Sequence, residues 1–203
     1  MPVLDRALQD LSASEEVRRQ LDAFIELFAR WNAKINLSAA RDRPAIRAQV
    51  ADSLYIVPHL AGASAVLDVG SGGGLPVFPA ALWWPQLQFT ALEPVHKKHA
   101  FLRTAARQLG ALNLDARAER LEDHLRADYD VAMSRATFDV REWVERGLLR
   151  VRPGGRVLAM EGLRRDDLPR DWERHEYAFA DKQRAILVAH RPPLPPAPAP
   201  VPA

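Results

Sequence analysis

The sequence predicts an α/β domain with a doubly wound, mostly parallel sheet, preceded by an N-terminal helical extension. Three observations lead to this fold class. After about residue 65, short apolar runs rich in β-branched residues alternate with helical segments, as expected for parallel strands joined by crossover helices. A glycine-rich segment directly follows the first of these runs, and the preceding residues show helical periodicity. We therefore expect a helical extension over residues 1–60, a main domain over 61–190 and a mobile, Pro/Ala-rich tail over 191–203.

The N-terminal segment predicts two helices. Ser12 stands three residues before Glu15, which is the spacing of a capping box, and it marks the expected start of the first helix. Apolar residues then recur at helical intervals, namely Val17, Leu21, Phe24, Ile25, Phe28 and Trp31. A second helix is expected over about 44–59, with an apolar stripe of Ile46, Val50, Leu54 and Val57. Both stripes should pack against the main domain.

The main domain predicts parallel strands over residues 65–69, 87–92, 114–118, 129–134 and 156–160. Helices are expected over 97–109, closed by Gly110 as a C-cap, and over 143–151. A turn should follow at Pro153-Gly154-Gly155. The last apolar runs, 177–179 and 185–189, could close the sheet as an antiparallel pair.

Composition restricts the class of protein. The 203 residues suit one domain with an appendage, and 48% of them are hydrophobic, as in globular proteins. The absence of cysteine excludes disulfides and thiolate metal sites. No apolar run approaches the roughly 18 residues that span a bilayer, and no signal peptide is evident, so we expect a cytoplasmic protein. We also expect a monomer without a metal. The net charge of +2 is compatible with a nucleic-acid partner but does not require one.

The most informative segment is Asp68-Val69-Gly70-Ser71-Gly72-Gly73-Gly74. Glycines after the first strand let a ligand approach the backbone at the carboxyl edge of the sheet. The dinucleotide pattern G-x-G-x-x-G fails here, because its third glycine would fall at Leu75. The observed D-x-G-x-G-x-G resembles the nucleoside-binding loop of class I methyltransferases. Glu93 ends the second strand, 19 residues after Gly74, where an acid can accept hydrogen bonds from ribose hydroxyls.

Further motifs make the chain similar to the bacterial 16S ribosomal RNA guanine-N7 methyltransferases, the glucose-inhibited division protein B family. The resemblance runs from about Leu21 to Gly162 and rests on the order and spacing of short motifs. These are WNAKINLS at 31–38, Asp52-Ser53, DVGSGGGLP at 68–76, Lys97-Lys98 with Phe101-Leu102, and Ser134-Arg135-Ala136. The resemblance implies S-adenosyl-L-methionine as the cofactor and 16S ribosomal RNA, or the small ribosomal subunit, as the partner. Because guanine N7 carries a free lone pair, no general base is needed.

The resemblance also implies roles for particular residues. The cofactor would be bound by Asp68, Gly70, Gly72, Gly74, Leu75, Glu93, Leu121, Glu122 and Arg135. Among these, Leu121 and Glu122 match the pair beside the adenine. Arg135 would also act as the catalytic residue, because it reaches toward both the cofactor and the target nucleotide. Substrate binding would involve Lys34, Asn36 and Arg135.

Three positions depart from the family pattern. Gln49 stands in place of the usual His, Val77 in place of a glycine, and Glu161 in place of a Lys near the expected substrate mouth. A carboxylate at Glu161 should weaken the attraction of RNA phosphates. Two other functions therefore stay open at this stage. One is a methyltransferase of the same ancestry that acts on a small molecule or another RNA, and the other is a non-catalytic module that binds cofactor or RNA.

Overall fold

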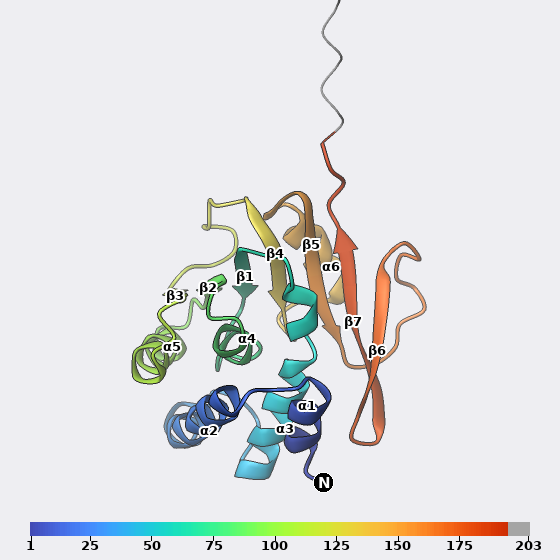
Figure 1. The fold of residues 1–203 in the computed structure, drawn as a ribbon. Helices are drawn as coiled ribbons and strands as arrows, with labels where there is room; N and C mark the ends of the chain where they lie inside the picture. Colours follow the sequence, from blue (N-terminus) through green and yellow to red (C-terminus); the bar gives the residue numbers. More distant parts are fainter. Residues whose placement is uncertain (195–203) are drawn as a thin grey trace, which may run out of the picture.

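The sheet predicted from the sequence is present in the computed structural model, which describes residues 1–194 (Figure 1). Seven strands lie in the order β3-β2-β1-β4-β5-β7-β6. Their bounds are β1 Ala65–Val69, β2 Gln88–Leu92, β3 Leu114–Arg117, β4 Tyr129–Ser134, β5 Val151–Glu161, β6 Glu173–Phe179 and β7 Lys182–His190. The first five strands pair in parallel, whereas β7 pairs antiparallel with both β5 and β6. The doubly wound α/β class is confirmed, including the closing antiparallel pair.

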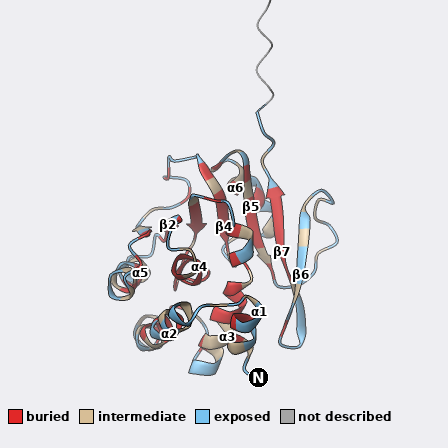
Figure 2. Ribbon diagram, in the orientation of Figure 1, coloured by how far each residue is buried: buried red, intermediate tan, exposed pale blue. Residues whose placement is uncertain are grey.

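Helices cover both faces of this sheet. They are α1 Val3–Asp10, α2 Glu15–Ile35, α3 Arg43–Leu54, α4 Val77–Trp83, α5 His96–Leu109 and α6 Val140–Leu148, with a 3₁₀ turn at Val57–Leu60. Successive strand residues alternate between two cores: Val66 packs with α1–α5, and Leu67 packs with α6. The extension therefore shares one core with α4 and α5 (Figure 2). Between residues 1 and 194, no helix is long and apolar enough to cross a membrane.

Helix boundaries in the extension differ from the prediction in three places. Ser14, not Ser12, caps α2, and its hydroxyl accepts a hydrogen bond from the Val17 N–H at 3.2 Å. Ser12 instead has a φ of 54°, in the turn that follows α1, a helix the sequence analysis did not predict. The second helix ends at Leu54 and not near residue 59. Pro58 has no N–H to donate to the Leu54 carbonyl, so the chain continues as a 3₁₀ turn.

The segment predicted as a helix end and turn is part of a long strand. Helix α6 begins after Asp139, whose side chain accepts from the Arg141 N–H, and it ends at Leu148. Strand β5 then runs through Pro153-Gly154-Gly155 as a bulge. Val151 faces Tyr129 and Arg156 faces Val131, so β5 advances by five residues while β4 advances by two. Gly154 adopts a φ of 79° and donates its N–H to the Arg191 carbonyl. Glycine thus permits a bulge here, where the sequence indicated a turn.

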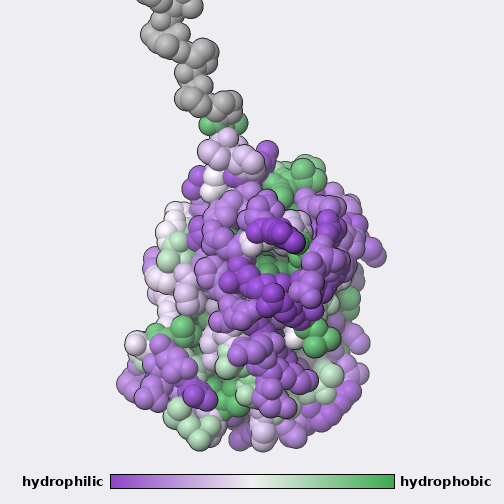
Figure 3. Space-filling model, turned by 90° about the vertical axis from the view of Figure 1, so that its right-hand side faces the viewer, coloured by the Kyte–Doolittle hydropathy of each residue, from purple (hydrophilic) through white to green (hydrophobic). Residues whose placement is uncertain are grey.

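Strand β6 forms one edge of the sheet, and its side chains are largely charged. Figure 3 shows that this side of the molecule is predominantly hydrophilic. Glu173, Arg174, His175 and Glu176 follow one another along the strand, and all four take part in ion pairs across or beside it. Charged side chains on an edge strand oppose pairing with another chain.

A cluster of aromatic rings joins the extension to the main domain. The Phe24 ring stacks on the Phe78 ring with 5.0 Å between centroids, and the Phe28 and Phe101 rings meet edge to face at 5.9 Å. Trp31 also packs against Phe101, at 5.6 Å. These residues come from α2, α4 and α5, so the cluster fixes α2 beside the glycine-rich segment.

We predict that Phe101→Ala lowers the free energy of unfolding by about 3–5 kcal/mol, the usual cost of truncating a fully buried Phe. Urea unfolding followed by circular dichroism measures this change. Leu112→Ala is the matched control: its side chain is 93% exposed, so we expect a change within about 0.5 kcal/mol. Equal effects of the two substitutions would contradict the role given to the aromatic cluster.

Candidate cofactor and acceptor site

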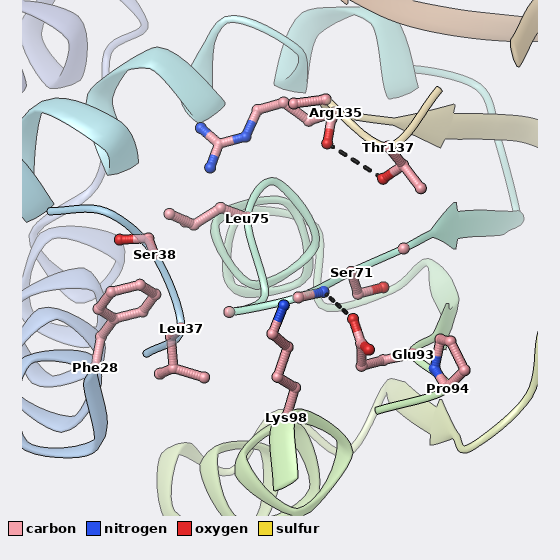
Figure 4. A pocket seen from close by; sticks show the side chains of 14 residues that line it. Phe28, Leu37, Ser38, Ser71, Leu75, Glu93, Pro94, Lys98, Arg135 and Thr137 are labelled. Atoms are coloured by element: carbon pink, nitrogen blue, oxygen red, sulfur yellow. Dashed lines mark hydrogen bonds between the residues drawn. The ribbon is translucent and has the colours of Figure 1, made fainter. Parts of the chain in front are cut away.

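A cavity of about 410 Å³ opens at the carboxyl ends of β1, β2 and β4 (Figure 4). Ligands of open α/β sheets bind at this edge. The lining comes from the glycine-rich loop, the ends of β2 and β4, helix α5 and the extension. It consists of Phe28, Leu37, Ser38, Gly70, Ser71, Gly72, Gly73, Leu75, Glu93, Pro94, Lys98, Arg135, Ala136 and Thr137.

Hydrogen bonds to the end of β2 hold the glycine-rich loop. The N–H groups of Gly70 and Ser71 both donate to the Leu92 carbonyl, at 2.9 and 3.0 Å. The Gly72 N–H donates to Glu93 Oε2 at 2.7 Å (Figure 4). A Cβ at Gly70 would lie 2.3 Å from Thr137 Oγ1, whereas a Cβ at Gly72 would meet only a carbonyl oxygen at 3.7 Å. The backbone at Gly72 is therefore open to a ligand.

Glu93 is only 4% exposed, and the backbone N–H groups orient its carboxylate. Besides Gly72, the Val95 N–H donates to Oε1, at 2.8 Å. Each carboxylate oxygen has two lone-pair sites, so one acceptor site on each oxygen is left. This arrangement can accept two further hydrogen bonds from adjacent hydroxyl groups in the cavity.

Asp68 lies beneath the loop with an uncompensated carboxyl group. Its side chain is 1% exposed, and neither carboxylate oxygen has a hydrogen-bond partner among residues 1–194. Burial raises the pKa of Asp68 to about 7. The guanidinium of Arg135 acts in the opposite direction, because a positive charge favours the ionised carboxylate. A cationic ligand in the cavity would favour the ionised form in the same way.

Arg135 lies between this cavity and a second one. Its Nη1 donates to Ser53 Oγ at 3.3 Å and to the Gln49 carbonyl at 3.5 Å, and it lies 3.8 Å from Asp52 Oδ2. The second cavity has a volume of about 490 Å³. It is lined by Gln49, Asp52, Arg135, Ala136, Phe138, Met160, Glu161, Gly162, Tyr177 and Arg184. One guanidinium therefore borders two adjoining spaces.

Asp52 organises the second cavity. Its buried carboxylate accepts from the Tyr177 hydroxyl at 2.9 Å and from Arg184 Nη1 at 2.6 Å. Burial and this carboxylate raise the pKa of Tyr177, so the phenol stays protonated. Gln49 Oε1 is buried without a hydrogen-bond partner among the described residues. The wall thus offers cationic donors from Arg135 and Arg184 to a polar ligand.

The site residues proposed from the sequence fall into two groups, those at the first cavity and those away from it. Gly70, Gly72, Leu75, Glu93 and Arg135 line the first cavity, and Asp68 lies beneath it. The remaining ones, which do not line it among residues 1–194, are Gly74, Leu121, Glu122, Lys34 and Asn36.

Each of these five has other surroundings. Gly74 has a φ of 80°, and a Cβ there would lie 2.3 Å from the Phe78 ring. Leu121 is buried in the core under α6, while Glu122 pairs with Arg146 at the surface, and their role beside an adenine stays a prediction. Lys34 lines a separate hollow between α2 and α5. Asn36 ends α2 in the left-handed region and accepts from Arg41.

Sequence reasoning missed the wall contributed by the extension. Phe28 of α2 lines the cavity together with Leu37 and Ser38 of the following loop, and the buried Asn32 holds this loop. The Asn32 amide accepts from the Ser38 N–H at 2.8 Å and donates to the Ala40 carbonyl. The available signal was the WNAKINLS motif itself. A buried Asn in the last turn of an amphipathic helix indicates that the following loop is fixed in place.

Glu161 differs from the expectation of a bare anion near the substrate. The side chain lines the second cavity, but it is buried and paired with Arg174 from β6. It also accepts from the Arg165 N–H, at 2.9 Å. Because the guanidinium neutralises the carboxylate, this departure from the family pattern adds little negative potential at the site. The substitution is thus compensated within the chain.

These features fit the expected S-adenosyl-L-methionine. The open backbone at Gly72 leaves room for a nucleoside, and Glu93 has free acceptor sites for ribose hydroxyls. The cofactor carries positive charges on its sulfonium and ammonium groups, and the unpartnered carboxyl of Asp68 lies beneath the same loop. Within residues 1–194, no three or more His, Cys, Asp or Glu side chains are grouped to hold a metal ion.

Comparisons with known proteins agree with this geometry. Residues 17–190 match the model of the GidB family, described as rRNA small subunit methyltransferase G. The ribosomal RNA small subunit methyltransferase G of Aromatoleum aromaticum is 38% identical over 176 residues, covering 82% of this chain and 83% of its own. The protein of that name from Burkholderia multivorans is 40% identical over 179 residues, covering 81% and 78%.

Solved structures show the same fold at low sequence identity. The S-adenosylmethionine-dependent methyltransferase SibL superposes with a TM-score of 0.64 at 18% identity, covering 94% of this chain and 74% of its own. A methyltransferase from Geobacter sulfurreducens gives a TM-score of 0.61 at 14% identity, with 83% and 90% covered. At such identities the likeness shows the fold alone.

The buried carboxyl of Asp68 predicts a specific pH dependence of stability. Its pKa is higher in the folded than in the unfolded chain, so the folded state holds the proton more tightly between about pH 4 and pH 7. Asp68 therefore makes the free energy of unfolding fall as the pH rises through this window. Relative to wild type, Asp68→Asn should gain up to about 2 kcal/mol between pH 5 and pH 7.

Urea unfolding of the unliganded protein at both pH values measures this gain. Asp123→Asn, at an exposed position, is the control and should run parallel to wild type. If the free energy of unfolding of Asp68→Asn changed with pH in parallel with that of wild type, Asp68 would be ionised in the folded protein at pH 5.

Proposed function

The chain belongs to the GidB family, and from this premise we propose that it transfers a methyl group from S-adenosyl-L-methionine to small-subunit ribosomal RNA, at N7 of a guanine. The observation that carries the proposal is a nucleoside-sized cavity at the carboxyl edge of the sheet, joined through Arg135 to a second polar cavity. Two adjoining cavities suit a reaction between two bound molecules.

The cofactor would lie across the backbone at Gly70–Gly73, with its ribose hydroxyls donating to Glu93. The orientation of the Glu93 carboxylate by two backbone N–H groups supports this role, because the acceptor is held in place before the ligand binds. The carboxyl of Asp68 would be ionised in the complex, since the positive charges of the cofactor favour the carboxylate. Phe28, Leu37 and Leu75 would exclude water from the opposite wall.

In this reaction the protein contributes mainly the positions of the reactants and the charges around them. When bound, the cofactor supplies an activated methyl group on a sulfonium. Guanine N7 has an in-plane lone pair and loses no proton when it is alkylated, so no general base is required. The residues around the two cavities would instead hold the base and the methyl group in line.

The target base would enter the second cavity. Arg135 could donate to guanine O6, which lies beside N7, and so orient the reacting edge. Gln49 also lines this cavity, and a rotation of its side chain would bring the buried, unpartnered Oε1 within reach of the N1–H or N2–H groups of guanine, which adenine does not offer in this pattern. Asp52 acts through its neighbours, because it positions Arg184 and Tyr177 and lies near Arg135.

We predict that Glu93→Ala weakens S-adenosyl-L-methionine binding by about 1–3 kcal/mol, the cost of stranding hydrogen-bonding groups, or roughly 5- to 150-fold in Kd. Gly72→Val should abolish binding, because its side chain would point into the cavity and a φ of 54° disfavours a β-branched residue. Calorimetry measures both affinities. Glu142→Ala, an exposed acid on α6, should bind like wild type.

Thermal unfolding of the same proteins distinguishes a lost ligand site from a lost fold. Unchanged affinity in a folded Glu93→Ala variant would remove Glu93 from the site.

Mass mapping of 16S ribosomal RNA from a deletion strain tests the reaction itself. We expect one N7-methylguanine to disappear and to return when the wild-type gene is supplied. Arg135→Ala should restore at most about 1% of the transfer rate, since a misplaced substrate costs about 100-fold. This variant should still bind the cofactor measurably by calorimetry. A guanine that stays methylated in the deletion strain would contradict the proposed target.

A further inference from the structure

Two segments of the chain carry positive charge without any negative charge. Residues 27–41 contain three Lys or Arg, and residues 94–114 contain four, whereas neither segment contains Asp or Glu. Over the whole chain the two signs nearly balance, with 28 cations and 26 acids. The two segments are therefore local exceptions in composition.

The fold brings these two segments together. Helices α2 and α5 lie side by side, and Phe101 of α5 packs against Phe28 and Trp31 of α2 (Figure 1). These two helices carry five exposed cations, which we call the basic face: Arg30 and Lys34 on α2, and Lys97, Arg103 and Arg107 on α5. The neighbouring Lys98 extends this charge to the edge of the cofactor cavity, which it lines (Figure 4).

Within the part of the chain that the structure describes, no cation of the basic face forms an ion pair. The first half of α2 is different, because Arg18 and Arg19 pair there with Glu15 and Glu16. Like charges close together without counter-charges repel one another and attract polyanions. The arrangement thus favours an external anionic partner.

The basic face also contains an apolar hollow. A space of about 380 Å³ lies between α2 and α5, lined by Leu27, Arg30, Trp31, Lys34, Ile35 and Gln108. The indole of Trp31 is partly exposed in it. Aromatic and apolar surface flanked by cations is the combination that binds unstacked bases together with their phosphates. A lipid headgroup surface would use the charges but not such a recess.

We propose that the basic face is a docking surface for the phosphate backbone of the RNA substrate, and that it takes an unstacked nucleotide in the hollow beside Trp31. This inference rests on the proposed function, since the docked strand is the one that presents its base to the second cavity. Helix α5 has 14 residues and a length of about 21 Å, so the face extends well beyond one nucleotide. Lys34, expected from the sequence to bind substrate, would then contact RNA remote from the reacting base.

A quadruple variant, Arg30→Gln, Lys34→Gln, Arg103→Gln and Arg107→Gln, tests the proposal in the full-length protein. Wild type and variant are titrated with a 16S ribosomal RNA transcript at 50 to 200 mM salt. Each phosphate contact contributes about 0.7–0.9 to the slope of log K against log salt. We expect the variant to lose about 3 from the magnitude of this slope, with an unchanged Kd for S-adenosyl-L-methionine. The KM for RNA should rise while kcat at saturating RNA stays near wild type.

The matched control removes four cations that are already paired, through Arg19→Gln, Arg43→Gln, Arg126→Gln and Arg164→Gln. An equal loss of slope in this control, or an unchanged slope in the test variant, would overturn the proposal. Binding to vesicles of phosphatidylserine and phosphatidylcholine is measured in parallel. Loss of vesicle binding with RNA binding intact would assign the face to a membrane surface instead. Wild-type protein that binds the transcript but methylates no guanine would contradict the proposed function and leave the docking surface standing.

Discussion

The site depends on one set of backbone hydrogen bonds, between the loop after β1 and the end of β2. The Leu92 carbonyl accepts two N–H groups of this loop, and the Glu93 carboxylate accepts a third. These bonds turn the chain sharply enough to leave its backbone facing the cavity. They also couple the loop conformation to the acid that would hold the ribose, because the same Glu93 side chain serves both. The rest of the fold holds β1 and β2 in register so that these groups meet.

The N-terminal extension is part of the site and not an accessory to it. Its aromatic residues pack into the core shared with α4 and α5, and a Cβ at Gly73 would already lie 2.6 Å from Phe28 Cε2. The extension therefore forms the wall opposite Glu93, and it also carries one half of the basic face. Through α3 it supplies Gln49 and Asp52 to the second cavity. The two cavities thus share one packed unit.

Local features were predictable from the sequence, and tertiary ones were not. The bounds of β1 and β4, the left-handed Gly110 that ends α5 and the glycine loop follow from neighbouring residues. The bulge in β5 was misread as a turn, because its glycines are held by Arg191, which lies far along the chain. Similarly, no local pattern shows that Ser38 faces the cavity or that Lys34 lies apart from it. Such placements follow from how α2 packs against α5.

The ion pair between Glu161 and Arg174 has an evolutionary consequence. Glu161 is buried, and a buried charge left without its partner costs about 3–5 kcal/mol, so Arg174 cannot readily change alone. A relative that carries Lys at the position of Glu161 would set two cations against each other if it kept this Arg. The two positions should therefore covary among homologues: the sign of the charge at position 161, at the end of β5, should change together with the residue at position 174 on β6. The residue at the position of Arg174 on the edge strand should therefore indicate whether a homologue carries an anion or a cation beside the second cavity.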